Sequence, residues 1–372
     1  MAIKFDAAGL QAGEALRRAR IYLGARTFAP GAGGISRVAR LMAKVLAQQH
    51  ADAPTPMRAV AVEDAVPNRF GSLPVAVKDR SIWRFVADIQ RAQLSYTHFL
   101  YDELSMARAH TALPLRRPSL SFFHGIEVWE QGLASRVRCA RKVDMLVANS
   151  AYTRARAERV HGGFGRARVC WLGTEDDAPA RSAPQFTGPP TVLMVGRLHA
   201  GRDKGHRALI RAWPRLCAKI PSARLVIVGQ GNDAAALKQE AAACGVAQRI
   251  AFLGFLPDEQ LSAIWEQAWV FAMPSRGEGF GLVYIEAMRH GLPVIGSVHD
   301  AAPEVNVDGE TGYNVDLHRP NQLTDRLWQL LTDPDRCRTL GTQGRKRWQR
   351  HFTYSAFCRR FCAILDEFLA MQ

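Results

Sequence analysis

Residues 275–296 read SRGEGFGLVYIEAMRHGLPVIG, and this stretch guides the interpretation of the whole chain. The run before it, WVFAM, is apolar, which predicts a buried strand. The glycines that follow predict a turn, and GLVYIEAMRH predicts a helix that ends at the next glycine. This order places Glu278 at the carboxyl end of the strand and Glu286 about two turns into the helix.

The two acids of this stretch, Glu278 and Glu286, have seven residues between them and can face one crevice, because ligands of open α/β sheets bind outside the carboxyl ends of the strands. The free N–H groups of residues 279–283 predict an anion site at the start of the helix. Acids beside an anion site suit a ligand that carries both hydroxyls and phosphates. The simpler alternative is that both acids are solvated surface charges. It is weakened by the apolar neighbours of Glu286, because a carboxylate among them needs a partner.

Two series of short apolar runs alternate with segments of helical period, which predicts two parallel sheets with crossover helices. The first series is RIYLG (20–24), PMRAVAV (56–62), YTHFLY (96–101), PSLSFFHG (118–125) and DMLVANS (144–150). The second series is TVLMVGRL (191–198), RLVIVGQG (224–231), RIAFLGFL (249–256), WVFAMPS (269–275) and PVIGS (293–297).

The length of 372 residues also favours two domains, since a single core rarely serves so long a chain. The Pro-rich segment EDDAPARSAPQFTGPP predicts a linker between the two series. We therefore expect an N-terminal domain over residues 1–174, a linker over 175–190 and a second domain over 191–343. A final helical segment over 344–372, rich in basic and aromatic residues, is expected to cross back to the first domain.

The chain is basic, with a net charge of +15, and residues 1–174 hold 26 Lys and Arg against 13 Asp and Glu. Such a field attracts polyanions, including nucleic acid and acidic lipid headgroups. Seven scattered cysteines without a C-x-x-C pair favour a reducing cytoplasm over a disulfide framework. The start of the chain lacks the apolar run of a signal peptide, and no stretch is apolar enough to span a membrane.

The opening stretch resembles the signature of glycosyltransferase family 4, whose members are retaining enzymes of the GT-B fold. Other landmarks of this family follow one another over nearly the whole chain: PGAGGISR (30–37), FFHGIEVW (122–129) and VGRLHAGRDKGH (195–206). The resemblance implies an α/β GT-B architecture in which two Rossmann-like, doubly wound domains face each other across a central cleft. The N-terminal domain would serve the acceptor, and the second domain would bind the nucleotide sugar.

By the same resemblance, the expected activity is transfer of a hexosyl unit from a UDP- or GDP-sugar to an acceptor hydroxyl, with retention of configuration. Bacterial polysaccharide, lipopolysaccharide or glycolipid synthesis is the expected setting. The acceptor would be a saccharide or a lipid-linked molecule. An epimerase or a phosphorylase on the same scaffold is the nearest alternative, although a phosphorylase usually needs pyridoxal phosphate and a longer chain.

The resemblance also assigns roles to individual residues. Arg197 and Lys204, although spaced more widely than in the commonest family pattern, would neutralise the leaving diphosphate, and His124 would hydrogen-bond the transferred sugar. Glu278 would hold sugar hydroxyls and Glu286 the ribose. The remaining members of the expected donor site are Gly33, Gly34, Gly229, Phe255, Leu256, Phe280, Gly281, Leu282 and Val283. The simpler alternative for Arg197 and Lys204 is an ordinary surface base, and for His124 it is a histidine satisfied at a strand end.

Three competing patterns carry less weight. VGQGNDA (228–234) loosely matches a dinucleotide-binding fingerprint but follows the second strand of its domain. Asp333 and Asp335, in a D-P-D sequence, resemble a metal motif of another fold but predict the start of a helix. The histidines show no metal-ligand spacing, so we expect no metal and no cofactor. Nucleic-acid binding is the alternative from a different class, yet the basic segments ALRRAR (15–20) and RVRCARK (136–142) lack interleaved aromatic residues for base stacking.

The basic first domain suggests docking at the inner, cytoplasmic face of an anionic membrane without crossing it. Trp83, Trp129 and the segment RKRWQR (345–350) are the expected docking surface. Equally, these bases could serve only to keep a cytoplasmic enzyme soluble.

Overall fold

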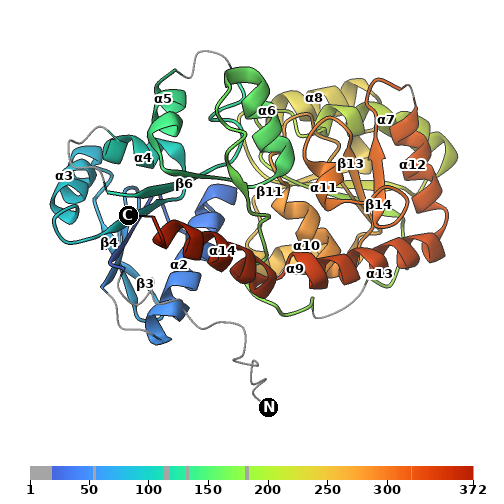
Figure 1. Cartoon of the computed structure of the whole chain (residues 1–372). Coiled ribbons are helices and arrows are strands. Elements are labelled where there is room, and N and C mark those ends of the chain that lie inside the picture. Colours follow the sequence, from blue (N-terminus) through green and yellow to red (C-terminus); the bar gives the residue numbers. More distant parts are fainter. Residues whose placement is uncertain are drawn as a thin grey trace. The chain divides into compact units, whose positions relative to one another are not determined.

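The computed structural model describes residues 19–52, 56–111, 117–130, 134–180, 184–319 and 321–371. The chain divides into two compact units, coloured in chain order in Figure 1. The N-terminal unit comprises Met1–Asn149, Thr153–Trp171 and Phe357–Gln372, and the C-terminal unit comprises Ser150–Tyr152 and Leu172–Ala356. Residues 1–18, which hold most of the N-terminal segment that lacks a signal-peptide pattern and most of ALRRAR, lie outside the described residues.

In the described part of the N-terminal unit, eight strands form one sheet in the order β3-β4-β2-β1-β5-β6-β7-β8. All neighbours are parallel except β3 and β4, which form an antiparallel edge. The strands are β1 (Ile21–Ala25), β2 (Met57–Ala61), β3 (Asn68–Phe70), β4 (Leu73–Val77), β5 (His98–Tyr101), β6 (Ser119–Phe123), β7 (Met145–Ala148) and β8 (Arg168–Val169). The helices that begin in the first half of the chain are α2 (Gly34–Asp52), α3 (Ile82–Ala92), α4 (Leu104–Thr111), α5 (Ala134–Lys142) and α6 (Ala151–His161).

The sheet of the C-terminal unit is parallel throughout its six described strands, in the order β11-β10-β9-β12-β13-β14. The strands are β9 (Thr191–Val195), β10 (Arg224–Val228), β11 (Ile250–Gly254), β12 (Val270–Ala272), β13 (Val294–Ser297) and β14 (Gly312–Val315). The helices are α7 (His206–Lys219), α8 (Ala234–Ala243), α9 (Asp258–Gln267), α10 (Leu282–His290), α11 (Ala302–Val305), α12 (Gln322–Leu331) and α13 (Pro334–His351).

The central strands of both sheets are buried because helices cover both faces, as parallel sheets require. Every residue of β1 and β6 is buried, and so are the three residues of β12. This explains why the sequence shows continuous apolar runs and not an alternating pattern. In the C-terminal sheet the strand order reverses between β9 and β12, and in the N-terminal sheet between β1 and β5. Ligands of doubly wound sheets bind at the carboxyl ends of the strands at such points.

The last helix, α14 (Tyr354–Leu369), begins in the C-terminal unit and continues from Phe357 into the N-terminal unit. There its aromatic face packs on the sheet, where Phe361 contacts the ring of Phe122 at a centroid distance of 5.8 Å. Residue 344, the expected start of this final helix, falls inside α13. The D-P-D sequence starts α13, because Asp333 accepts a hydrogen bond from the Arg336 amide at 2.8 Å, which confirms the predicted helix start.

Candidate functional site

The turn between β12 and α10 brings the glutamate of the opening stretch to the carboxyl edge of the sheet. Gly281 precedes the helix with a φ of 90°, and a Cβ atom there would lie 2.2 Å from the Tyr284 ring. Only glycine fits this close approach at a positive φ. The turn therefore depends on a residue that the sequence motif contains, and it leaves the first amides of α10 at the same edge as Glu278.

Glu278 and Lys204 form an ion pair, with 3.0 Å between Lys204 Nζ and Glu278 Oε2. The two residues come from separate motifs, 74 positions apart in the chain. The side chain of Glu278 is 18% exposed and that of Lys204 is 35% exposed. Two of the predicted site residues thus lie against each other at the switch point of the C-terminal unit.

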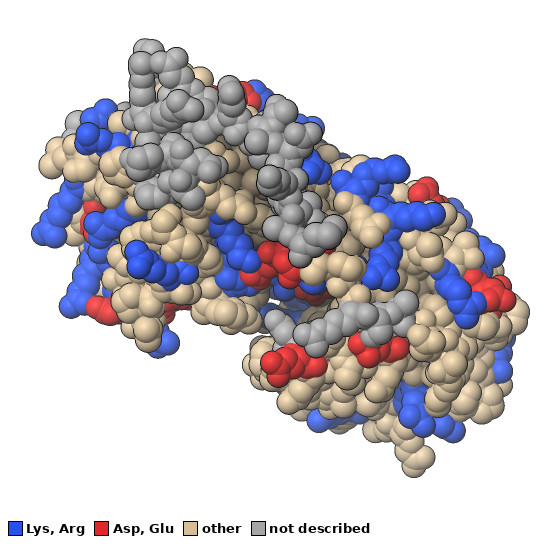
Figure 2. Space-filling view, turned by 90° about the horizontal axis from the view of Figure 1, so that it is seen from below, with Lys and Arg blue, Asp and Glu red and all other residues tan. Residues whose placement is uncertain are grey.

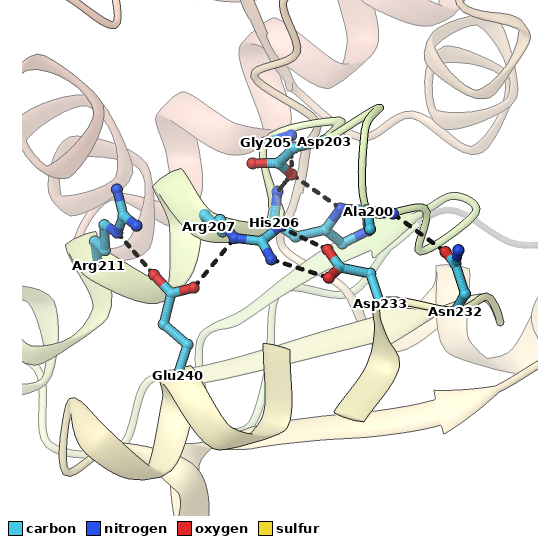
Figure 3. A network of polar contacts seen from close by, with 9 residues as sticks. All are labelled: Ala200, Asp203, Gly205, His206, Arg207, Arg211, Asn232, Asp233 and Glu240. Atoms are coloured by element: carbon cyan, nitrogen blue, oxygen red, sulfur yellow. Dashed lines mark hydrogen bonds and ion pairs between the residues drawn. The ribbon is translucent and has the colours of Figure 1, made fainter. Parts of the chain in front are cut away.

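A polar network fixes the loop that carries Lys204 (Figure 3). Asp203 Oδ1 accepts hydrogen bonds from the amides of Gly205 and His206 at 3.0 and 2.8 Å, which caps the start of α7. Asn232 Oδ1 accepts a hydrogen bond from the Ala200 amide at 3.2 Å. Burial opposes the charge of Asp203, but the hydrogen bonds from the His206 ring and from both amides outweigh it and lower the pKa of this carboxyl. The loop is therefore pinned at both ends.

The same network continues across helices α7 and α8. Arg207 donates to both oxygens of Asp233, at 2.6 and 2.9 Å, and its guanidinium also pairs with Glu240. The hydrogen bond from Arg207 is the main cause that lowers the pKa of Asp233. A bidentate pair of this kind fixes orientation as well as distance. It ties the start of α8 to α7, the helix that begins two residues after Lys204 (Figure 3).

Gly229 and Gly231 allow two backbone segments to touch behind the Arg197 loop. Their φ angles are +142° and +159°, and a Cβ atom would lie 1.9 Å from the carbonyl oxygen of Gly196 and of Leu198, respectively. Both glycines are therefore required by packing.

The other predicted donor residues take different positions. Phe280 is buried, with its ring 5.9 Å from that of Phe352, so only its backbone is available to a ligand. Phe255, by contrast, is 57% exposed just after β11. Glu286 is half-buried on α10, and Arg197 is exposed after β9. Leu256, Leu282 and Val283 are half-buried.

Sequence reasoning missed Asp300, a buried acid that follows β13. Its carboxylate accepts hydrogen bonds from the Glu278 amide at 3.1 Å and from the Ser275 hydroxyl. Burial raises the pKa of Asp300 to about 7, and the nearby charge of Glu278 adds to the shift, against the hydrogen bonds that oppose it. The available signal was an acid just beyond a predicted strand end, the same signal that identified Glu278.

In the N-terminal unit, His124 follows β6 at the carboxyl edge of the sheet. Its Nε2 lies 2.7 Å from the carbonyl oxygen of Asp102, and a carbonyl only accepts, so Nε2 carries a proton. In the neutral ring this leaves Nδ1 as a hydrogen-bond acceptor. Gly33, with a φ of 109°, and Gly34, the first residue of α2, form the turn after β1.

Asp102 was also missed by sequence reasoning, although it directly follows the predicted strand YTHFLY. It is fully buried, and its Oδ2 accepts the Arg26 amide at 3.1 Å. Burial, and then the charge of Glu103, raise the pKa of Asp102 well above its usual range. Asp102, Arg26 and His124 therefore form a polar cluster across the ends of β1, β5 and β6.

A cavity of about 1020 Å³ opens beside this cluster, at the carboxyl ends of β1 and β2. Its polar wall includes Arg26, which pairs with Glu63 at 3.6 Å and with Glu103 at 3.0 Å. Asp64 accepts the Phe28 amide at 2.9 Å and thereby holds the start of the glycine-rich turn. The lining also includes apolar Val66 and Ile82, which are 73% and 43% exposed.

A group of possible metal ligands, His299, Asp316 and His318, lies within 4.8 Å in the C-terminal unit. Two guanidinium groups already occupy its surroundings. Arg276 approaches His318 Nε2 at 3.2 Å, and Arg319 pairs with Asp316 at 3.5 Å. Two positive charges at this range oppose a dication. We therefore interpret this group as an ion-pair cluster at the ends of β13 and β14.

The expected docking surface needs correction. Trp83 is 80% exposed, but Trp129 and Trp348 are 6% and 1% exposed. Trp129 lies under the guanidinium of Arg156, and Trp348 donates to Thr174. Their rings fill the interior, so neither contributes to a surface. Figure 2 shows Lys and Arg side chains scattered over the visible face, with Asp and Glu between them. In the described part of the chain, no helix is long and apolar enough to cross a membrane.

The family model for glycosyl transferases group 1 matches residues 177–347. A GDP-mannose-dependent monoacylated alpha-(1-6)-phosphatidylinositol monomannoside mannosyltransferase from Corynebacterium glutamicum is 32% identical over 66% of this chain and 68% of that protein. A related mannosyltransferase from Mycolicibacterium smegmatis is 34% identical over 60% of this chain and 63% of that protein. The chain thus spans less than two thirds of the length of the second of these relatives.

Solved structures agree in fold. The Anabaena protein HepE, in complex with UDP and glucose, matches with a TM-score of 0.77 and 19% identity over 93% of this chain and 99% of that one. Sucrose-phosphate synthase from Thermosynechococcus elongatus matches with a TM-score of 0.76 and 21% identity over 95% and 100%. The expected GT-B fold is confirmed. By its sequence relationship to the mannosyltransferases, the chain belongs to the group 1 glycosyl transferases.

Proposed function

We propose that the protein is a retaining hexosyltransferase that moves a sugar from a nucleotide donor to an acceptor hydroxyl. The observation that carries this proposal is the Lys204–Glu278 ion pair. It sets a cation suited to a diphosphate against an acid suited to sugar hydroxyls, at the switch point of the C-terminal sheet. The names of the relatives, which use GDP-mannose, support the same reaction class and make GDP-mannose the first donor to test.

In this proposal the donor is bound mainly by its charged and polar groups. Arg197 and Lys204 neutralise the diphosphate as negative charge grows on the leaving group. The amides of residues 280–283 add N–H donors at the start of α10. Glu286 accepts the ribose hydroxyls, and exposed Phe255, with Leu256, offers an apolar surface to the base. Gly229, Gly33 and Gly34 allow close approach of backbone.

Retention of configuration follows if the acceptor attacks from the face that the diphosphate leaves. The departing phosphate then takes the acceptor proton, and the chain needs no nucleophile of its own. His124 would steady the transferred sugar, because its Nδ1 is left to accept a hydroxyl hydrogen bond. In this scheme the two cations replace a metal, so activity should not depend on a divalent ion.

For the acceptor we propose the cavity of the N-terminal unit. Its charged groups suit ring hydroxyls, which both donate and accept hydrogen bonds, and its exposed apolar side chains suit a lipid chain. A lipid-linked saccharide fits both kinds of lining. Arg26→Ala should therefore impair acceptor use while leaving nucleotide affinity unchanged.

We further propose that the enzyme works in the cytoplasm, at the inner face of an anionic membrane. The net positive charge and exposed Trp83 support this proposal. Sedimentation with vesicles should rise with anionic lipid content and fall with salt. Trp83→Ala should weaken sedimentation, whereas equal sedimentation with neutral vesicles would contradict the proposal.

The central experiment incubates the protein with GDP-mannose or UDP-glucose and a lipid-linked saccharide, with and without a chelator. Proton NMR of the product then reads the anomeric configuration. Retention in the presence of the chelator supports the proposal. An inverted product, a free sugar phosphate or an epimerised nucleotide sugar would each assign a different reaction. Glu286→Ala provides a matched test of donor binding, with a loss of about ten- to a hundred-fold in affinity expected.

A further inference from the structure

Asp300 is hydrogen-bonded to the loop that carries Glu278. The residue is 3% exposed and comes three positions after β13. Its Oδ2 accepts both the Glu278 amide, at 3.1 Å, and the Ser275 hydroxyl. Its Oδ1 accepts the Ala302 amide at 2.9 Å, which anchors the carboxylate itself to the start of α11. One carboxylate therefore joins the Glu278 loop to the segment after β13.

Two further hydrogen bonds to backbone carbonyl groups connect the same two segments. The Ala301 amide donates to the carbonyl oxygen of Glu278 at 3.1 Å, and the Ser297 hydroxyl donates to the carbonyl oxygen of Ser275. Both polar backbone groups of Glu278 are thus held by residues 300 and 301. The side chain of Glu278 is left to meet Lys204.

We infer that Asp300 is a positioning residue, whose carboxylate fixes the backbone of Glu278 so that the Glu278 side chain keeps its place beside Lys204. The inference rests on the proposed role of Glu278 in reading the donor sugar. Catalytic side chains must be held within roughly 0.5 Å of their working position, which requires supporting hydrogen bonds behind them. Asp300 would act through Glu278 and not touch the substrate.

A carboxylate at this buried position carries an energetic cost. A buried carboxylate loses its hydration, and here it also faces the charge of Glu278. Tyr284, from α10, is a further ionisable group in reach of its charge, His299 is its neighbour in the chain, and Lys204 lies beyond Glu278. A neutral residue would avoid the cost of the charge. What the carboxylate adds is acceptors for two amides and a hydroxyl at once.

A pH dependence follows from this arrangement. Because the pKa of Asp300 lies at about 7, the carboxylate is ionised at pH 8 and increasingly protonated below pH 7. Protonation turns one acceptor into a donor, which faces the N–H and O–H donors around it and loosens the loop. Turnover should therefore fall as pH drops through about 7.

The test compares Asp300→Asn with a matched control, Asp144→Asn. Asp144 lies in the N-terminal unit and accepts the amide and the hydroxyl of Ser119, whereas Asp300 accepts two amides and a serine hydroxyl. Hydrogen exchange of the peptide around residues 275–280 is measured first, at pH 8. Turnover of GDP-mannose, the probe donor, is then followed by GDP release from pH 5.5 to 9.

We expect faster exchange at the Glu278 amide in Asp300→Asn only, turnover lowered about ten-fold at pH 8 with little change in KM, and loss of the inflection near pH 7. Asp144→Asn should keep the exchange of this peptide and the pH profile of the parent. Unchanged exchange in Asp300→Asn, or an unchanged inflection, would overturn the inference. A parent protein that does not turn over any nucleotide sugar would count against the proposed function, whereas the exchange result would still decide the contact.

Discussion

Removing the negative charge of Glu278 should tighten the binding of GDP, although it should slow catalysis. Lys204 is paired with Glu278 at 3.0 Å. If Lys204 serves the donor diphosphate, the carboxylate competes with the ligand for the same cation. Glu278→Gln removes the negative charge but retains the side-chain volume and one acceptor oxygen.

The magnitude follows from the geometry of the pair. Two unit charges 3.0 Å apart interact by about 5–6 kcal/mol at an effective dielectric constant of about 20. Lys204 is 35% exposed, so solvent screening and side-chain entropy reduce the net value to about 1 kcal/mol. We therefore expect GDP to bind about five-fold more tightly to Glu278→Gln. Lys204→Ala should bind GDP about ten- to a hundred-fold more weakly, because it loses a charge-assisted contact.

Isothermal titration calorimetry with GDP at low salt measures both effects, and the double variant completes a thermodynamic cycle. The double variant should bind like Lys204→Ala, because Glu278 has no cation to compete for once Lys204 is gone. Glu240→Gln is the control, since Glu240 pairs with Arg207 and Arg211 and not with Lys204. Weaker GDP binding in Glu278→Gln than in the parent would refute the competition and the shared role of Lys204.

Three further outcomes are expected. Gly231→Ala should lower the free energy of unfolding of the C-terminal unit by more than about 3 kcal/mol, because its Cβ would lie 1.9 Å from a carbonyl oxygen. Gly245→Ala has open space around it and should cost only about 1 kcal/mol, for its positive φ. Urea unfolding of the two variants measures this difference. Burial lowers the pKa of His290 to about 4. The unfolded chain therefore takes up a proton at His290 as pH falls from about 6.5 to 4 while the folded chain does not, and stability is lost in that window. His290→Gln should make the melting temperature less dependent on pH between 6.5 and 4, and an unchanged slope would contradict this prediction. Asn232→Ala should release the Ala200 amide and lower turnover several-fold at an unchanged melting temperature. Turnover equal to that of the parent protein would show that the Lys204 loop keeps its position without this hydrogen bond.

Much of the architecture could be read from local sequence. Parallel strands buried on both faces need continuous apolar runs, so runs such as TVLMVGRL (191–198) identify the strands, and β9 was found at residues 191–195. Gly281 and Gly291 mark the two ends of helix α10, because each has a positive φ that a side chain disfavours. Both glycines are visible in the sequence of residues 275–296. Such features are local, since they depend on neighbours in the chain.

The burial of Trp129 and Trp348, by contrast, could not be predicted from their neighbours in the chain. The basic neighbours of Trp348 and the overall positive charge of the first domain made both residues look exposed, yet each ring is covered by a residue distant in sequence, such as Thr174 beneath Trp348. Amphipathic side chains like arginine can lie over an aromatic ring and still reach water, so charge nearby does not predict exposure.

The candidate site shows the same limit. The sequence named Lys204 and Glu278 separately, but only the fold of the C-terminal unit placed them 3.0 Å apart. The fold also brought in Asp300, whose carboxylate accepts a hydrogen bond from the Glu278 amide although the two residues are 22 positions apart in the chain. The sequence alone determined which segments become strands and helices and which polar residues stand at strand ends, because period and turn chemistry act over a few residues. The tertiary structure decided which of those polar residues meet, since adjacent strands of a parallel sheet can be far apart in the chain and hydrogen bonds between their ends depend on the packing of the whole unit.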